Sequence, residues 1–207
     1  MTVAVIDYGM GNIGSIRNML KYIGAPHVVS SDRAEIAACE KIVLPGVGHF
    51  DLAMRNLAER DLIEPLRELV LERRTPILGI CLGMQLMCSA SEEGDRAGLG
   101  YVAAQVRRFP LTAQTGLKVP HMGWSQVAFR KETALSAGLG EAARFYFVHS
   151  YRVACDDPQD VWGVTDYGGS FVSAFVRDNI AGVQFHPEKS HRYGIQLFRN
   201  FVAGFGA

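Results

Sequence analysis

The sequence lacks the cysteine patterns that mark metal sites and disulfide frameworks. It has four cysteines in 207 residues, Cys39, Cys81, Cys88 and Cys155, with no CxxC pair and no Cys/His cluster among them. We therefore expect no structural zinc site and no bound metal. A disulfide framework is also not expected in a chain of this length without a secretory signal. Each cysteine has to be judged singly, and its default role is that of a small buried apolar residue.

Net charge and long apolar runs are absent as well. The 21 basic and 21 acidic residues cancel, so no long-range field favours nucleic acid or an anionic membrane as a partner. No apolar stretch approaches the roughly 20 residues that a membrane-spanning helix needs. The first residues, MTVAVIDYGMGN, lack the basic region of a signal peptide. We expect a soluble, cytoplasmic protein that binds neither nucleic acid nor membrane.

In the first half of the chain, apolar patterning predicts alternating strands and helices. Strands are expected at residues 3–7, 28–29, 41–44 and 76–80, and helices at 13–23, at 50–74 and from 82 onward. Pro65 is expected near the start of a second helix within 50–74. This alternation indicates a parallel sheet covered by helices on both faces.

The second half has a different pattern, in which strands follow one another before a final helix at about residues 191–205. The predicted strands are 102–109, 125–129, 145–148, 161–165, 172–177 and 180–185, with a turn at Asp178 and Asn179 between the last two. The sequence shows no repeat and no linker. We therefore predict a single α/β domain over residues 1–207, with a mostly parallel central sheet and an antiparallel strand extension.

Cys81 lies in the pentapeptide GICLG, residues 79–83, at a predicted strand-to-helix junction. The pattern G-x-C-x-G is analogous to the nucleophile elbow of hydrolases. Such a turn would expose the thiol near a helix N-terminus, where thiolate is favoured. It would also aim the N–H of Leu82 at a developing oxyanion. The alternative is a buried cysteine in a glycine-flanked turn, which is the role expected for the other three cysteines as core or surface residues.

A nucleophilic cysteine needs a base, and the segment GVQFHPE offers His186 followed by Glu188. In extended backbone, residues i and i+2 face the same side. Glu188 could therefore hold one imidazole nitrogen while the other faces the thiol. Alone, the segment could equally hold a capping histidine and a solvated glutamate. Together with Cys81, it favours a Cys–His–Glu triad.

These motifs resemble those of a known family. GICLGMQ and GVQFHPEKS are similar to the triad segments of the class I glutamine amidotransferases. The segments AVIDYGMGNIGSI, LPGVGHFDLAM, VPHMGW and FYFVHSY narrow the resemblance to the glutaminase subunits of imidazole glycerol phosphate synthases. The match runs from Val3 to about Phe201 without a large insertion.

The resemblance implies that L-glutamine is hydrolysed to glutamate and ammonia through a cysteinyl thioester. Cys81, His186 and Glu188 would then be the catalytic triad. The oxyanion hole would combine the N–H of Leu82 with that of Val47 or Gly48. The glycines on either side of Val47 would let the peptide between them reorient at low cost. We hypothesise that this hole is completed when a ligand binds to the partner. The α-amino and α-carboxylate groups of glutamine would be bound by Gln85, Ser150 and Tyr151.

The resemblance also implies a heterodimer with a (β/α)8-barrel cyclase subunit. That partner would use the ammonia to make imidazole glycerol phosphate and an aminoimidazole carboxamide ribotide in histidine biosynthesis. The expected partner contacts are Asn12, Met122, Trp124 and Lys189, while His49, His121 and His149 are expected to be structural or at the interface. No cofactor is expected.

One motif formally indicates a different ligand. Residues 9–14, GMGNIG, spell G-x-G-x-x-G after a strand, and Asp32 follows 18 residues later, as in a dinucleotide fingerprint. The family resemblance explains these glycines as a tight turn at the subunit contact. In addition, no separate substrate domain is present to receive a hydride, and no Walker loop indicates ATP binding.

Three other functions stay open at this point. The chain could be the glutaminase of another pathway, such as anthranilate or aminodeoxychorismate synthesis, although the segments AVIDYGMGNIGSI and VPHMGW argue against this. It could be a stand-alone thiol hydrolase or peptidase that uses the same triad. It could also be a non-enzymatic interaction module with a decayed site, although all three triad positions are filled.

Overall fold

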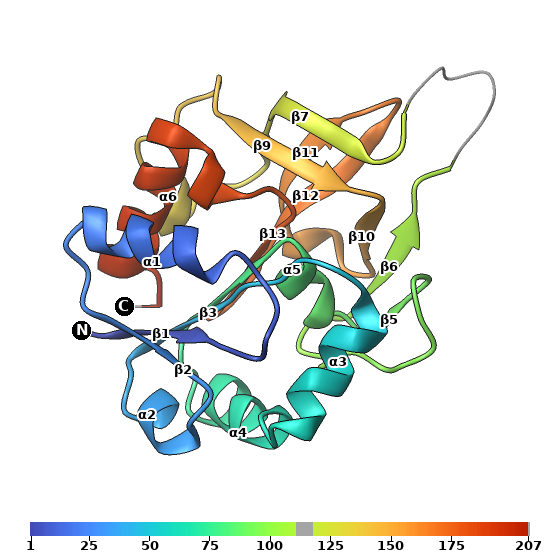
Figure 1. Cartoon of the computed structure of the whole chain (residues 1–207). Helices are drawn as coiled ribbons and strands as arrows, with labels where there is room; N and C mark the ends of the chain where they lie inside the picture. Colours follow the sequence, from blue (N-terminus) through green and yellow to red (C-terminus); the bar gives the residue numbers. More distant parts are fainter. Residues whose placement is uncertain (111–117, 207) are drawn as a thin grey trace.

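The computed structural model describes residues 1–110 and 118–206 (Figure 1). Strands and helices alternate in the first half, as expected. The elements there are β1 (Val3–Ile6), α1 (Ile13–Tyr22), β2 (His27–Ser30), α2 (Arg33–Ala37), β3 (Lys41–Leu44), α3 (Phe50–Glu59), α4 (Ile63–Arg67), β4 (Ile77–Ile80) and α5 (Leu82–Leu86). A π-helical turn, Glu68–Glu72, continues α4.

The second half consists mainly of strands and ends in a long helix. Its elements are β5 (Ala90–Ser91), β6 (Ala104–Arg108), β7 (His121–Gln126), β8 (Ala128–Phe129), β9 (Arg144–His149), β10 (Tyr151–Cys155), β11 (Val161–Asp166), β12 (Ser170–Arg177), β13 (Ile180–Val183) and α6 (His191–Gly204). A short 3-10 turn, Pro187–Lys189, lies between β13 and α6. Within the described ranges, no helix has both the length and the apolar character needed to cross a membrane.

The main sheet has a parallel part and an antiparallel part. The parallel part has the strand order β2-β1-β3-β4-β13. Beyond β13 the sheet continues through β12, β10 and β6, each antiparallel to the strand before it, while β7 and β9 form a separate antiparallel pair. The predicted parallel sheet with an antiparallel extension is confirmed.

Side chains of the parallel strands alternate between two apolar cores. In β1, Val3 and Val5 pack with the buried residues of α1 and α6, whereas Ala4 and Ile6 pack with those of α2, α3 and α4. This is the period of two that a strand imposes. Figure 1 shows α1 and α6 on one side of the sheet and α2, α3 and α4 on the other. Helices therefore cover both faces, as the sequence pattern predicted.

Several short elements differ from the predictions. The elements α2, β5 and β10 were not predicted, and the predicted strand 125–129 is divided between β7, which begins earlier at His121, and β8. The helical stretch at 50–74 does contain the two helices expected there, α3 and α4, which are separated near Asp61, whose φ is 53°. Pro65 lies in the first turn of α4, as expected. These short elements bury too few residues to produce a clear apolar period.

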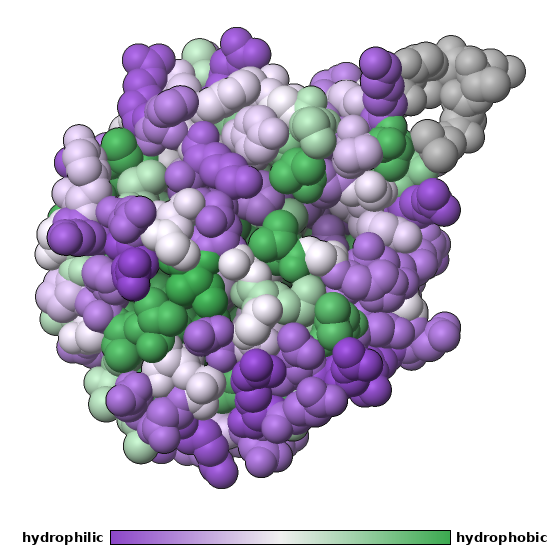
Figure 2. Space-filling view, viewed as in Figure 1, coloured by the Kyte–Doolittle hydropathy of each residue, from purple (hydrophilic) through white to green (hydrophobic). Residues whose placement is uncertain are grey.

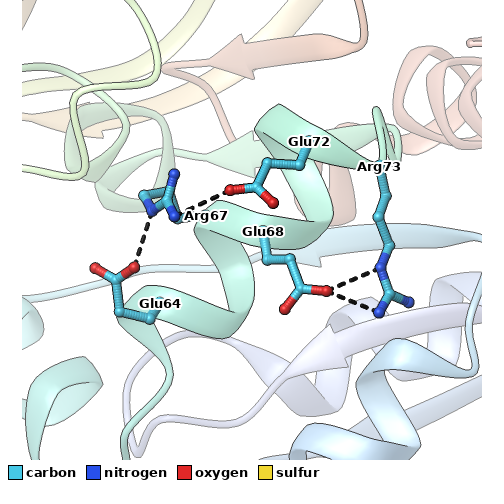
Figure 3. A network of polar contacts seen from close by, with 5 residues as sticks. All are labelled: Glu64, Arg67, Glu68, Glu72 and Arg73. Carbon is cyan, nitrogen blue, oxygen red and sulfur yellow. Dashed lines mark hydrogen bonds and ion pairs between the residues drawn. The ribbon is translucent and has the colours of Figure 1, made fainter.

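An exposed network of ion pairs covers α4 and the π-helical turn (Figure 3). The guanidinium of Arg67 lies 2.9 Å from Glu64 and 3.0 Å from Glu72, and that of Arg73 lies 2.8 Å from Glu68. Water screens such exposed charges. We therefore assign the network a small, local stabilising role.

The helix α6 approaches the turn after β13 very closely at Gly194. A Cβ atom at this position would lie 1.7 Å from the carbonyl oxygen of Pro187. The same segment is held by Ser190, whose hydroxyl donates to the carbonyl of His186 at 2.6 Å and accepts from the N–H of Tyr146 at 3.0 Å. The backbone of residues 186–190 is thereby fixed between β9 and α6.

Two histidines are buried where β7 pairs with β9. His121 and His149 face each other in the strand register. The rings of Phe147 and Tyr167 stack on His121, with centroids 4.9 and 4.0 Å away, and Phe171 lies 5.3 Å from His149. Burial lowers the pKa of His121 to about 4 and that of His149 to about 3. Both rings are therefore neutral near pH 7.

We predict that Gly194→Ala destabilises the fold by about 1–3 kcal/mol, because the backbone carbonyl of Pro187 cannot move aside without disturbing the turn. Gly14→Ala in α1 is a matched control, since its Cβ would meet no atom within 4 Å. The control should be neutral or stabilise by up to about 1 kcal/mol. Urea unfolding of the two variants measures the difference, and equal effects would contradict the close approach.

We also predict that the histidine pair makes the fold acid-sensitive. Because the folded-state pKa of His149 is depressed, the unfolded chain binds protons below about pH 6.5 that the folded chain does not bind. Stability is therefore fully present above pH 6.5 and falls as the pH drops toward 3. His149 alone should account for about 2 kcal/mol between pH 6.5 and 5. Urea unfolding at several pH values should show a shallower loss for His149→Gln, and an unchanged slope would contradict this assignment.

Candidate active site

Cys81 forms a strained turn between β4 and α5. Its backbone has φ 54° and ψ −110°, a conformation that non-glycine residues rarely adopt and that costs about 1–3 kcal/mol. The N–H of Cys81 donates to the carbonyl of Val183 at 2.8 Å, which holds the turn against the end of β13. This is the geometry expected for a nucleophile elbow.

Glycines on both sides of Cys81 are required by close backbone contacts. A Cβ at Gly79 would lie 2.8 Å from the carbonyl of Gly83, and a Cβ at Gly83 would lie 1.9 Å from the carbonyl oxygen of Leu44. A Cβ at Gly46 would lie 2.6 Å from the backbone nitrogen of Gly83. The loop after β3 therefore lies directly against the first turn of α5.

That loop contains the other predicted oxyanion donors. Val47 is 40% exposed, and Gly48 is exposed with a φ of +116°. Position 48 thus uses a conformation that favours glycine. The contact of Gly46 with the Leu82–Gly83 backbone places the start of this loop directly beside the first residues of α5.

His186 and Glu188 form a buried pair. The imidazole Nδ1 lies 2.8 Å from Oε1 of Glu188, and both side chains are 1% exposed. Asn12 donates to the same carboxylate oxygen at 3.4 Å. Within the described part of the chain, the Nε2 atom of His186 has no conventional hydrogen-bond partner.

The protonation of His186 depends on Cys81 as well as on Glu188. Burial is the largest single influence and opposes the charged imidazole. Hydrogen bonding and charge interactions with Cys81 and Glu188 outweigh it and raise the pKa of His186 to about 10. The thiol is thus an immediate neighbour of the imidazole, although their contact is looser than a conventional hydrogen bond. Catalytic contacts are commonly loose before substrate binds.

The predicted exposure of the thiol is not observed, because Cys81 is only 6% exposed. Its neighbours Gln184 and His186 are 0% and 1% exposed. A substrate that reaches the sulfur must enter through this small opening or displace side chains around it. The elbow geometry is therefore present, and its accessibility is set by the segments that cover it.

Two of the predicted glutamine-binding residues, Gln85 and Tyr151, are in direct contact. Gln85 is buried one turn along α5, and its Nε2 donates to the carbonyl oxygen of Tyr151 at 3.4 Å. Ser150 and Tyr151 are half-buried at the junction of β9 and β10. The structure thus brings Gln85 and the 150–151 segment together.

Sequence reasoning missed Gln184. Its Oε1 accepts from Nε2 of Gln85 at 2.9 Å, and its Nε2 lies 3.6 Å from Sγ of Cys81. The two-residue periodicity that paired His186 with Glu188 would have pointed to this residue as well. Residue 184 precedes His186 by two positions in the same extended segment.

The other cysteines lack this setting. Cys88 is fully buried, and burial raises its pKa well above the usual range. Burial also raises the pKa of Cys39, and it raises that of Cys155 to about 12. All four cysteines are free thiols. Cys39, Cys88 and Cys155 thus have the ordinary environments predicted for them.

The predicted partner contacts lie mainly on one surface. Met122 and Trp124 of β7 are 61% and 40% exposed. The Trp124 ring stacks on His191 with centroids 5.4 Å apart, and Lys189, also exposed, has its Nζ 5.9 Å from the ring centroid of Tyr146. We call Met122, Trp124, Tyr146, Lys189 and His191 the β7 patch. Asn12 differs from these residues because its side chain contacts the carboxylate of Glu188.

The remaining predicted polar residues have structural contacts. His49 caps α3 by accepting from the N–H of Asp51 at 3.2 Å. The carboxylate of Asp32 caps α2 by accepting from the N–H groups of Ala34 and Glu35, each at 2.9 Å. Asp32 is therefore a helix cap in this fold. Across the described residues, no group of three or more His, Cys, Asp or Glu side chains is arranged to hold a metal ion.

The chain is similar to known proteins over nearly its whole length. The family model described as "Glutamine amidotransferase class-I" matches residues 4–205. The chain is 49% identical over 200 residues to "Imidazole glycerol phosphate synthase subunit HisH 2" of Methanococcus maripaludis and 48% identical to the protein of that name in Pseudomonas aeruginosa. Each alignment covers 97% of this chain and 98% of the relative.

Solved structures show the same fold at lower sequence identity. One described as "Crystal structure of glutamine amidotransferase" superposes with a TM-score of 0.73 at 18% identity and covers 99% of both chains. PurLQS from Thermotoga maritima gives a TM-score of 0.72 at 18% identity, over 97% of this chain and 96% of that chain. The family match and the close relatives together lead to one conclusion: the chain belongs to the class I glutamine amidotransferases and, within them, to the HisH subunits of imidazole glycerol phosphate synthase.

Proposed function

We propose that this chain hydrolyses L-glutamine to glutamate and ammonia, with Cys81 as the nucleophile. The observation that supports this most directly is the strained turn at Cys81 beside the buried His186–Glu188 pair. The strands β4 and β13 are adjacent and parallel, so these two distant segments leave the sheet at the same edge.

In the first half of the reaction, the sulfur of Cys81 adds to the amide carbon of glutamine. The N–H of Leu82, with that of Val47 or Gly48, stabilises the negative charge that develops on the amide oxygen. His186 then protonates the departing ammonia, which leaves a γ-glutamyl thioester on Cys81. The raised pKa of His186 supports this role, because the imidazole holds a proton near pH 7.

In the second half, His186 takes a proton from water as the water attacks the thioester, and glutamate is released. Glu188 holds the imidazole through Nδ1 and stabilises its charged form. Gln85, Ser150 and Tyr151 bind the α-amino and α-carboxylate groups of glutamine. Because Nε2 of Gln85 already donates to protein oxygens, its Oε1 is the atom available to the substrate's ammonium group.

The ammonia is useful only if it is passed on internally, since free ammonia is mostly protonated in neutral water. We propose that the recipient is a (β/α)8-barrel cyclase subunit in a heterodimer. That subunit would make imidazole glycerol phosphate and an aminoimidazole carboxamide ribotide in histidine biosynthesis. The relatives' names as synthase subunits support this assignment. The four free thiols support a cytoplasmic location, since disulfides are rare there.

The β7 patch is the proposed contact with the cyclase, together with Asn12. Figure 2 shows that apolar areas interrupt the mainly polar surface of this view. Met122 and Trp124 are among the large apolar side chains with the greatest exposure. Met and aromatic residues are enriched at protein interfaces. Completion of the oxyanion hole at Val47 or Gly48 would follow when a ligand binds to the partner.

We predict that Cys81→Ala lowers glutamine-dependent synthesis in the assembled complex by at least about 10³-fold, because the nucleophile is lost. Synthesis from added ammonium salt at high pH should continue, since the cyclase reaction does not need the thiol. Steady-state assays with each nitrogen source measure both rates. Equal loss of the ammonia-dependent reaction would show that Cys81 is structural.

Cys88→Ala is the matched control for this experiment. Cys88 is buried on the same segment as Cys81, and its thiol donates to the carbonyl oxygen of Met84 at 3.7 Å. Its replacement should leave glutamine-dependent synthesis intact. A chloroketone analogue of glutamine should label Cys81 and not Cys88, and mass spectrometry can distinguish the two.

We predict that Trp124→Ala weakens binding to the cyclase by about 30-fold, the loss typical of an aromatic hot spot of about 2 kcal/mol. Leu71→Ala is the control, because Leu71 is similarly exposed, at 39%, but lies on the π-helical turn after α4. Titration calorimetry with the cyclase measures both constants. Equal affinities for the two variants would exclude the β7 patch as the main contact.

A further inference from the structure

Gln184 makes an unusual contact for a buried amide. Its side chain is fully buried after β13, and its Nε2 lies 3.6 Å from Sγ of Cys81. Its backbone N–H already bonds to the carbonyl of Ser173 at 2.9 Å, so the segment is anchored without the side chain. The amide of Gln184 therefore has a role that sheet formation alone does not require.

The orientation of this amide follows from the carbonyl oxygen of Tyr151. A carbonyl oxygen can only accept hydrogen bonds, so Gln85 must face it with Nε2 rather than with Oε1, at 3.4 Å. The second N–H of the same nitrogen reaches Oε1 of Gln184 at 2.9 Å. Gln184 must then direct its own Nε2 toward Cys81. The sulfur consequently faces a donor and not an acceptor.

A second donor bonds to the same carbonyl oxygen. Nδ1 of His149 lies 2.7 Å from the oxygen of Tyr151 and must be the protonated nitrogen. Since this ring is neutral, its Nε2 accepts from Nδ1 of His121 at 3.0 Å. The other nitrogen of His121 accepts from the hydroxyl of Ser125 at 2.9 Å. The tautomers of both histidines are thereby determined.

These bonds join the thiol to strand β7. Ser125 and His121 both belong to β7, and Ser125 is adjacent to Trp124 of the β7 patch. Four of the side chains that link the thiol to β7 are buried, with exposures between 0% and 6%: His121, His149, Gln85 and Gln184. Water has little access to them, so each bond depends on the protein partner described here.

We propose that Gln184 is a positioning residue for Cys81, with its amide N–H directed at the sulfur by a hydrogen-bond chain that runs from β7 through Ser125, His121, His149, the carbonyl of Tyr151 and Gln85. The inference rests on the proposed glutaminase function. A donor beside the sulfur stabilises its negatively charged form and restricts its position next to His186. It also favours the sulfur as a leaving group when water attacks the thioester.

The test uses Gln184→Met in the assembled complex, since methionine has a similar length but no amide. A hydrogen bond to a charged group typically corresponds to a 10–100-fold change in rate. We expect kcat for glutamine hydrolysis to fall about 10-fold or more, with KM changed less than about 3-fold. The rate at which iodoacetamide alkylates Cys81 should fall by a similar factor. Ammonia-dependent synthesis should be unchanged.

Ser173→Ala is the matched control. Ser173 is fully buried on β12 beside Gln184, and its Oγ accepts from Thr165 at 2.9 Å, away from the hydrogen-bond chain. This variant should keep both the alkylation rate and kcat. If Gln184→Met fails to fold, Gln184→Glu retains the acceptor for Gln85 but removes the donor, and it should also slow alkylation.

The hydrogen-bonded connection between Gln184 and β7 is tested by His121→Phe, alone and combined with Gln184→Met. His121→Phe should slow alkylation less than Gln184→Met does, and the double variant should react no more slowly than Gln184→Met alone. Additive effects would overturn the connection to β7. Unchanged alkylation and kcat in both Gln184 variants, while Cys81→Ala is inactive, would overturn the positioning role and leave the proposed function standing. Glutamine-dependent synthesis by Cys81→Ala would instead refute the proposed function.

Discussion

The parallel pairing of β4 with β13 is the constraint on which the rest of the candidate site depends. In its register, Ile80 lies opposite Val183, and the N–H of Cys81 extends the ladder by one bond to the carbonyl of Val183. The residues that follow each strand therefore emerge at the same edge of the sheet. A slip of one residue would turn Gln184 and His186 to the other face of their segment and away from the sulfur.

Backbone strain at Cys81 is maintained by three sets of contacts. The turn is held by β13, by the glycine-mediated approach of the loop after β3, and by the close contact between flanking glycines 79 and 83. On the His186 side, Ser190 and the close approach of Gly194 fix the backbone between β9 and α6. The two halves of the site are thus positioned by different layers, and the shared sheet aligns them.

The larger elements, the turn at Cys81 and the contact between His186 and Glu188 were predictable because their signals are local. Continuous apolar strands such as β1, β3 and β4 are recognisable from a few residues, and the motifs around Cys81 and His186 specify a turn and an extended segment. By contrast, β10 has a single fully buried residue, Val153, and leaves a weak pattern. The assignment of residues 1–207 to one domain, and the catalytic and binding roles of the site residues, remain predictions.

What the sequence could not provide were properties that arise from distant segments. The contact of Gln184 with the sulfur requires Gln85 on α5 and Tyr151 on β10, which no local pattern relates. The low exposure of Cys81 likewise depends on how several segments close over it. The tautomers of His121 and His149 follow from one backbone oxygen, that of Tyr151, which only the assembled fold brings into hydrogen-bond range.

The cover over Cys81 has a consequence for the lifetime of the protein. A thiol poised for attack is also a target for hydrogen peroxide and for metabolites with electrophilic carbons, and its oxidation beyond the sulfenic acid is irreversible. With 6% of the residue accessible, such reagents meet the sulfur far less often than they would in an open cleft. The same packing that restricts entry of the substrate thereby protects the idle enzyme from chemical damage.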